Sequence, residues 1–168
     1  DQPLDRVNDV MTASKNSFQV TKEGDLYKIK ALNPGGGGRI NVKYIYTFAN
    51  VIQKYNDVAE LNRVFVDRGW KSQLKNVTVK VILPEGANKE ELKVFGHGPL
   101  SGESKIISER ELLFTVPVVK KGEYIDCRVV FPQRLVGQAR TTQNLEMLPK
   151  ILKEEGKLAD EANAQRNK

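Results

Sequence analysis

Apolar and polar residues alternate along several segments of this chain, and this period of two restricts its fold more than any other feature. Alternation places the apolar side chains of a strand on one face and the polar ones on the other. The pattern is clearest at 39–48, 75–83, 111–116 and 124–131. Strands with one apolar face are typical of antiparallel sheets, and short strands separated by turns are typical of β-sandwiches. The sequence therefore predicts a mainly β fold, an antiparallel β-sandwich with an immunoglobulin-like architecture.

The last alternating segment, 124–131, assigns each of its side chains to a face. Cys127 falls on the inward register, where a free cysteine is a small buried apolar group. Asp126 and Arg128 fall on the outward register and are expected to meet water. Weaker strands are expected at 17–20, 26–32 and 92–95.

One short helix is expected to interrupt the strands, at 57–66. Asp57 and Glu60 have the spacing of a capping box, in which each side chain bonds a free backbone N–H near the other. Apolar residues at helical spacing follow, namely Val58, Leu61 and Phe65. Capping accounts for both carboxylates without a metal or an acid–base role.

The chain changes character after residue 132. Residues 133–168 are rich in Leu, Glu, Lys, Ala, Asn and Gln, which predicts a helical extension. Pro149 fits the first turn of a helix. A helical stripe is expected from Leu145, Leu148 and Leu152, and the mostly polar residues beyond it are expected to form a solvated helix or a linker. The predicted organisation is a β-sandwich domain over 1–132, followed by a helical extension or linker over 133–168.

A single cysteine and a single histidine remove most of the chemistry open to this chain. One cysteine excludes an intramolecular disulfide, and Cys127 with His97 is too small a ligand set for a structural zinc site. The glycine-rich loop 33–39 lacks the lysine and the following helix of a phosphate-binding loop, so it is expected to be a flexible connection. We therefore expect no catalytic residues, no metal and no cofactor, and a protein that is not an enzyme.

Three residues are candidates for a ligand surface: Asp57, Trp70 and His97. His97 is the only imidazole, the side chain that titrates nearest neutral pH, and it lies in the turn-like stretch 95–99. A structural role is favoured for His97, since the sequence singles out no nucleophile or carboxylate partner. Trp70 is expected to pack the end of the short helix against the core, the alternative being an exposed platform for a ligand.

The net charge of +6 is spread evenly along the chain. Basic side chains exceed acidic ones by two in each of the segments 1–57, 58–132 and 133–168. A nucleic-acid-binding protein would instead gather its basic residues on one segment or face. The charge is therefore ascribed to solubility, with mild attraction to an anionic cell envelope, and no nucleic-acid partner is expected.

Five stretches of the sequence are distinctive when taken in order: 44–48, 51–61, Trp70, 76–84 and 95–98. Over about residues 40–132 they resemble the extracytoplasmic domain of predicted bacterial membrane proteins, the domain of unknown function 2207 family. Members of that family carry a signal or anchor helix, this domain, and then transmembrane helices. The resemblance implies that the tail from Leu145 leads toward a membrane helix outside this fragment. Because the family has no assigned activity, it supplies no functional residues.

These observations lead to one functional hypothesis and one alternative. The hypothesis is an extracytoplasmic module of a membrane-anchored bacterial protein, with a non-catalytic role in binding, assembly or spacing at the cell envelope. Its partner would be an unknown protein or envelope component, and membrane contact would come through segments outside this fragment. The alternative is an envelope enzyme, or a regulatory domain of one, that acts on a sugar or a peptide with His97 and Asp57 as participants.

Overall fold

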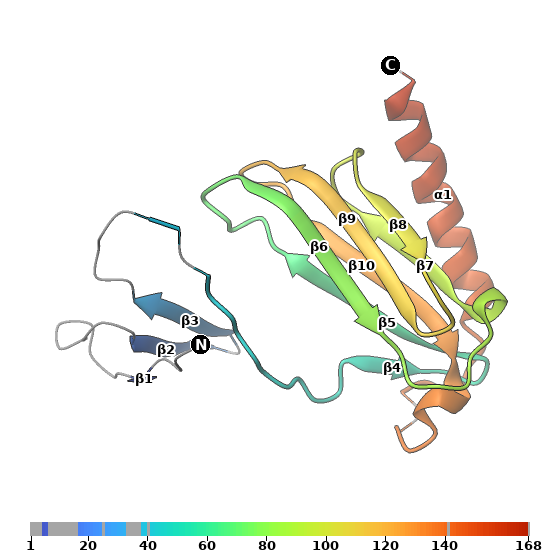
Figure 1. Ribbon diagram of the computed structural model, residues 1–168. Helices are drawn as coiled ribbons and strands as arrows, with labels where there is room; N and C mark the ends of the chain where they lie inside the picture. The colour runs from blue at the N-terminus through green and yellow to red at the C-terminus, as the bar shows by residue number, and fades with distance from the viewer. Residues whose placement is uncertain are drawn as a thin grey trace. The chain divides into compact units, whose positions relative to one another are not determined.

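The structure is a computed structural model that describes residues 5–6, 17–24, 26–32, 38–39, 41–140 and 142–167. These residues belong to two compact units, Asp1–Thr47 and Phe48–Lys168. Most of the regular structure is antiparallel strand, and helix α1 (Leu148–Arg166) lies near the C-terminal end (Figure 1). The prediction of a mainly β chain with a C-terminal helical extension is therefore confirmed.

Within its described residues, the first unit contains a small sheet. Its strands, in the order β1-β2-β3, are β1 (Asp5–Arg6), β2 (Ser17–Glu23) and β3 (Leu26–Leu32). β2 and β3 form an antiparallel hairpin, and Gly24 takes a positive φ of 60° that suits the tight turn after β2. The strands predicted at 17–20 and 26–32 are confirmed.

The strand predicted at 39–48 is wrong for the residues that the structure describes, because 41–48 form no strand. Alternation shows only which side chains share a face. A strand also needs a neighbouring backbone to hydrogen-bond, and the sequence pattern does not reveal one. Ile40 and most of the glycine-rich loop 33–39 lie outside the described residues. Large apolar side chains of the segment are exposed: Val42, Tyr44, Ile45, Tyr46 and Phe48.

The second unit packs two antiparallel sheets against each other (Figure 1). The first sheet, in the order β4-β5-β10-β7, consists of β4 (Ile52–Lys54), β5 (Val58–Val66), β10 (Ile125–Pro132) and β7 (Lys93–His97). The second, in the order β6-β9-β8, consists of β6 (Leu74–Ile82), β9 (Glu111–Val119) and β8 (Glu103–Ile106). Two short 3-10 helices lie in the connections, η2 (Lys89–Glu91) and η3 (Gln133–Val136). This arrangement agrees with the predicted antiparallel sandwich, and its immunoglobulin-like form stays a prediction.

Apolar residues on the inward registers form the core between the two sheets. Leu112, Phe114 and Val116 of β9 are buried, as are Val79 and Val81 of β6. The inward register of β10 is buried as well, and it comprises Ile125, Cys127, Val129 and Phe131. The predicted core position of Cys127 is confirmed, and removal of these side chains from water stabilises the sandwich.

The helix predicted at 57–66 is wrong, because these residues form strand β5. β5 lies between β4 and β10 and pairs with both in antiparallel register. Hydrogen bonds to two neighbouring strands satisfy its backbone, and this outweighs a local capping signal worth about 1 kcal/mol. Consecutive residues such as Ala59 and Glu60 are both buried, which shows that the two faces of this part of the sheet are both covered.

The outer face of the β4-β5-β10-β7 sheet carries helix α1 and is not left to water, contrary to the prediction. Arg128 is only 8% exposed, and Val130 beside it is fully buried. The sequence pattern correctly assigns Asp126 and Arg128 to the face opposite Cys127. Alternation cannot show that a helix from a distant part of the chain covers that face.

Helix α1 begins at Leu148 with Pro149 in its first turn, as predicted. Its buried face differs from the predicted stripe, since Leu145 and Leu152 are 40% and 43% exposed. The buried residues are instead spaced four apart: Met147, Ile151 and Glu155. A hydropathy pattern misses this face because one of its members is a glutamate. The residues beyond Glu155 are mostly exposed, in agreement with the predicted solvated helix.

Candidate functional site

A small apolar cluster packs helix α1 onto the outer face of the sheet. Its buried members are Tyr55, Val58 and Val130 from the sheet side, and Met147 and Ile151 from the helix and its start. A largely polar helix of this length gains most of its stability from such packing. The cluster therefore fixes the first half of α1 against β5 and β10.

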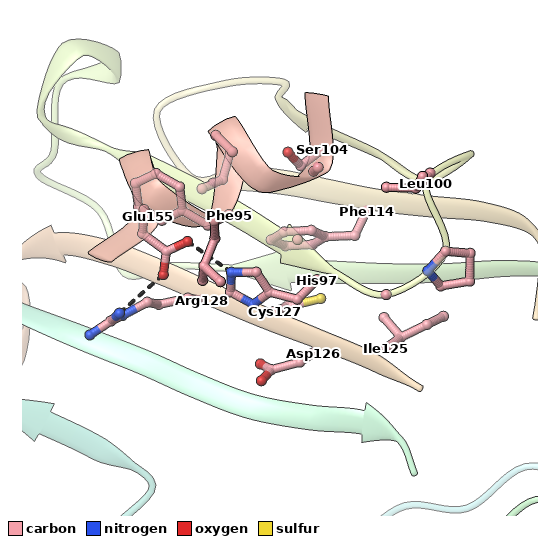
Figure 2. A pocket seen from close by; sticks show the side chains of 18 of the residues that line it. Phe95, His97, Leu100, Ser104, Phe114, Ile125, Asp126, Cys127, Arg128 and Glu155 are labelled. Atoms are coloured by element: carbon pink, nitrogen blue, oxygen red, sulfur yellow. Dashed lines mark hydrogen bonds and ion pairs between the residues drawn. The ribbon is translucent and has the colours of Figure 1, made fainter. Parts of the chain in front are cut away.

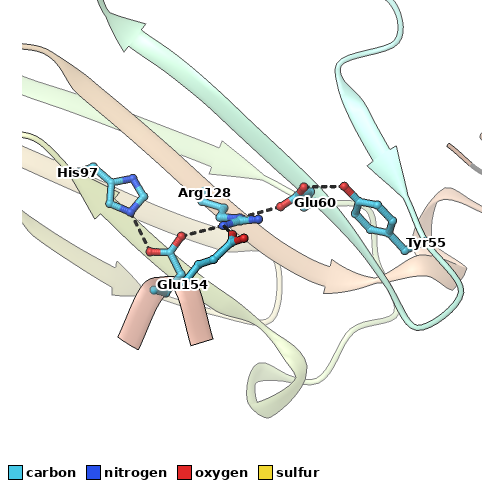
Figure 3. A network of polar contacts seen from close by, with 6 residues as sticks. Tyr55, Glu60, His97, Arg128 and Glu154 are labelled. Carbon is cyan, nitrogen blue, oxygen red and sulfur yellow. Dashed lines mark hydrogen bonds and ion pairs between the residues drawn. The ribbon is translucent and has the colours of Figure 1, made fainter. Parts of the chain in front are cut away.

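Arg128 of β10 is the centre of a polar network beside this cluster (Figure 3). Its Nε donates to Glu60 Oε2 on β5 at 2.7 Å. Its Nη1 donates to Glu155 Oε1 at 3.0 Å and to Glu154 Oε2 at 3.1 Å, both on α1. Burial alone would lower the pKa of Arg128, but the hydrogen bonds that it donates to Glu60, Glu155 and Glu154 raise it above its usual range. The guanidinium thus stays charged and joins the helix to the sheet.

Tyr55 extends the network on the β5 side. Its hydroxyl donates to Glu60 Oε1 at 2.8 Å, so both oxygens of the Glu60 carboxylate accept a hydrogen bond. Burial and this bond to a carboxylate raise the pKa of Tyr55 to about 12. The phenol is therefore a structural donor at neutral pH.

His97, at the end of β7, extends the network on the other side. Its Nε2 lies 2.8 Å from Glu155 Oε2, so Glu155 contacts both His97 and Arg128. The side chain of Glu155 is only 4% exposed. A buried carboxylate between two potential cations is well compensated, which explains how a glutamate can occupy the inward face of α1.

Asp126 lies beside the network with an unsatisfied oxygen. Its Oδ1 is buried and has no hydrogen-bond partner among the described residues. Asp126 stands opposite His97 in the register of β10 and β7, so the two side chains share the outer face. Burial raises the pKa of Asp126 above its usual value, and the charge of His97 acts in the opposite direction.

Asp57 caps a helix, but the helix is α1 and not the one predicted to follow it in sequence. Its Oδ1 accepts the backbone N–H of Met147 at 2.9 Å, and its Oδ2 accepts that of Leu148 at 2.8 Å. Burial alone would raise the pKa of Asp57, but these backbone donors lower it below its usual value. Both oxygens are therefore committed to the start of α1.

A cavity of about 890 Å³ lies where the second half of α1 passes over the sheet (Figure 2). Its lining comes from α1, from β7 and the loop after it, and from β8, β9 and β10. In Figure 2 the charged groups Arg128 and Glu155 lie toward one end, and Leu100 and Ile125 lie toward the other. His97 and Asp126 lie between these two ends. The cavity thus combines apolar walls with a few fixed polar groups, as small-molecule sites do.

The structure separates the three candidate residues of the sequence. His97 lines the cavity, whereas Asp57 and Trp70 are not among the lining residues. Trp70 is 50% exposed in the loop after β5, so the prediction that it packs a helix end against the core is wrong. Its alternative role as an exposed platform stays a prediction.

Sequence reasoning missed the residues that form the centre of the site. Arg128 and Asp126 look like ordinary outward residues of an alternating strand, and Glu155 looks like part of a charged helix surface. One signal was available, since Met147, Ile151 and Glu155 follow one another at helical spacing. A charged residue aligned with an apolar stripe can be buried when a partner of opposite charge faces it.

The thiol of Cys127 lines the cavity but is unreactive. Burial, followed by the nearby Asp126 charge, raises the pKa of the Cys127 thiol to about 12, so the thiolate is not populated at neutral pH. In the part of the chain that the structure describes, no group of three or more His, Cys, Asp or Glu side chains could hold a metal ion.

Comparison with known proteins identifies the family. Residues 3–131 match the N-terminal domain described as a predicted membrane protein (DUF2207), which confirms the resemblance seen in the sequence. No curated protein and no solved structure gives a significant match. Among the described residues, none of the helices combines the length and the apolar character that crossing a membrane requires. Since the match covers well over half of the chain, the protein belongs to the DUF2207 family of predicted membrane proteins, whose function is unknown.

Proposed function

We propose that this domain is a non-catalytic binding module on the extracytoplasmic side of a membrane-anchored protein, with the cavity beside α1 as its binding site. The cavity carries the proposal, because its volume of about 890 Å³ falls in the range of small-molecule sites. Arg128, Glu155 and the other groups of the network are fixed in place by mutual hydrogen bonds. A pre-organised polar end of this kind favours selective binding.

The roles of the candidate residues favour binding over catalysis. A general base must reach the proton that it removes, and a catalytic pair must reach the same substrate. The alternative, an envelope enzyme that acts on a sugar or a peptide, relies on His97 and Asp57. Only His97 lines the cavity, and both oxygens of Asp57 accept backbone N–H groups of α1. These contacts support a structural role for Asp57.

A paired substitution tests the binding function. Ala162 lines the cavity and is partly buried, whereas Ala164 is exposed on the same helix and does not line it. We expect Ala162→Trp in the full-length parent protein to reproduce the phenotype of a deletion strain, because the indole fills the cavity. Ala164→Trp is expected to behave as the wild type. An Ala162→Trp protein that fully replaces the wild type would contradict the proposal.

The side of the membrane on which this domain lies can be tested with an introduced thiol. Cys127, the only cysteine of this sequence, is buried and unreactive, and the parent protein without the new thiol measures the background. Asp160 is exposed on α1, and we expect Asp160→Cys to react with a membrane-impermeant maleimide in intact cells that carry the parent protein. Labelling that occurs only after lysis would place the domain on the cytoplasmic side.

A further inference from the structure

We infer that the cavity beside α1 accepts a ligand with a cationic head, a primary ammonium or a guanidinium, carried on an apolar body. This inference rests on the proposed binding function and names the chemical class of the ligand. It draws on three observations: a carboxylate with a buried oxygen that lacks a hydrogen-bond partner, the balance of charge around the cavity, and the apolar residues that line the cavity away from Arg128 and Glu155.

The first observation is the carboxylate of Asp126, which lines the cavity. Its Oδ1 is buried and lacks a hydrogen-bond partner among the described residues, although buried polar atoms in folded proteins are nearly always paired. Charge in such a poorly solvated position acts strongly on its surroundings. The N–H groups of an organic cation in the cavity would supply the missing hydrogen bond.

The second observation is the excess of acidic groups around the cavity. Among the described lining residues the fixed cations are Arg128, Lys157 and Arg166, with His97 as a titratable group. Arg128 already donates hydrogen bonds to three carboxylates: Glu154 and Glu155 of the lining, and Glu60, which lies outside it. The lining carboxylates are Glu103, which pairs with Lys105 outside the lining, and Asp126, Glu154, Glu155 and Glu161. Without Glu103 they still outnumber the fixed cations. This acidic balance stands against a net charge of +6 for the whole chain and therefore favours a cationic ligand.

His97 does not remove the excess. It stands opposite Asp126 in the strand register, but its Nε2 lies against Glu155 at 2.8 Å. One imidazole therefore faces two carboxylates, the buried Glu155 and the partly buried Asp126. Even when it is protonated, it supplies a single positive charge to this pair, so the site still favours an added cation.

The third observation is the apolar wall. Leu100, Phe114 and Ile125 line the cavity away from Arg128 and Glu155 (Figure 2). Leu158 of α1 lines it as well, and Arg166 donates to the Leu100 carbonyl at 3.2 Å. A ligand that consisted of a charge alone would leave this surface unused. The fit is to an amine or guanidine with several apolar carbons, such as a lysine or arginine side chain of a peptide or an alkylamine.

The test uses the full chain at pH 8, with three six-carbon probes that differ only in their heads: n-hexylammonium, n-hexanol and n-hexanoate. Binding is followed by titration calorimetry and by amide shifts of residues that line the cavity. We expect n-hexylammonium to bind more tightly than either of the other probes by about tenfold or more. The amide shifts are expected around His97, Asp126 and Leu158.

Matched variants connect the binding to the proposed residues. Asp126→Asn keeps the shape of the side chain but removes its charge, and we expect it to weaken n-hexylammonium binding by about tenfold or more. Asp160→Asn removes one carboxylate from α1 outside the lining and is expected to leave binding unchanged. Ala162→Trp is expected to abolish binding of every probe, because it fills the cavity.

Three results would overturn the inference. Equal affinity for n-hexanol and n-hexylammonium would show that the cation is not recognised, while the cavity would still bind a ligand as proposed. If Asp126→Asn and Asp160→Asn weakened n-hexylammonium binding equally, the cation would be attracted by the overall charge of the protein and not by Asp126. If only n-hexanoate bound, the cavity would favour an anionic ligand. A wild-type phenotype of Ala162→Trp would separately refute the binding function.

Discussion

At the scale of single residues, Arg128 joins the sheet to the helix, because one guanidinium bonds carboxylates on both β5 and α1. Two of these carboxylates, Glu60 and Glu155, are themselves buried. We predict that Arg128→Met lowers the free energy of unfolding by about 3 kcal/mol or more, since Glu60 loses its cation and Glu155 keeps only His97.

Urea unfolding at pH 7 measures this loss. Lys105→Met is the matched control, because Lys105 forms an ion pair with Glu103 in which the two side chains are 63% and 61% exposed. Such a surface pair contributes about 1 kcal/mol or less. Similar losses for the two variants would mean that the network around Arg128 is not buried in solution.

Asp126 has the opposite effect on stability. Burial raises its pKa in the folded protein, so the folded state holds its proton to higher pH than the unfolded state does. Its contribution to stability is therefore lost as pH rises from about 4 through the folded-state pKa. We predict that Asp126→Asn raises the free energy of unfolding at pH 8 by about 1 kcal/mol and weakens this dependence. A variant less stable than the wild type at pH 8 would show that the carboxylate has a partner.

At the scale of elements, the strands of the second unit follow from alternation, whereas the position of α1 does not. The inward residues of β6, β9 and β10 have the period of two that a half-buried strand requires, and they are buried as predicted. β5 was predicted as a helix because a capping box and a helical spacing are local signals. Its true state depends on pairing with β4, which directly precedes it, and with β10, which lies far along the chain.

The site was harder to predict than the strands because it depends on one element covering another. His97 was recognised as a candidate, since it is the only imidazole. Its partner Glu155 lies 58 residues away on α1, and no spacing rule connects the two. The prediction that Asp57 caps a helix at 57–66 is wrong, because 90 residues separate Asp57 from Met147, whose N–H it accepts at the start of α1.

The buried face of α1 can be tested by two neighbouring residues. Ile151 is fully buried, whereas Leu152 is 43% exposed. We predict that Ile151→Ala lowers the free energy of unfolding by about 2 to 4 kcal/mol, and that Leu152→Ala costs less than about 1 kcal/mol. Thermal or urea unfolding gives both values. A larger loss for Leu152→Ala than for Ile151→Ala would favour the helical stripe predicted from the sequence.

Asp57 tests the start of the same helix. We predict that Asp57→Ala destabilises the protein by about 1 kcal/mol at pH 7, because two N–H groups at the start of α1 lose their acceptors. The folded-state pKa of Asp57 is lowered, so its stabilisation is present at neutral pH and is lost as pH falls below about 4. A difference between wild type and variant that persists at pH 2 would contradict this account. Asp160→Ala, at an exposed position of α1, serves as the control.

At the scale of the whole molecule, the family match and the packing do not end at the same residue. The match ends at residue 131, at the end of β10, whereas α1 begins at Leu148. The outer face of the sheet nevertheless needs α1, since Arg128 and Val130 would be exposed without it. The helix is therefore part of the folded second unit, and the cavity exists only while α1 is in place.

Hydrogen exchange of the full chain tests this central claim most directly. The account predicts that the amides from Ile151 to Glu155, whose residues pack or bond on the sheet, exchange as slowly as those of the core strand β10. The amides near Arg166, at the exposed end of the helix, are expected to exchange faster. If the amides from Ile151 to Glu155 exchanged as fast as those of the exposed loop 67–73, α1 would not be held on the sheet, and the proposed cavity would not form.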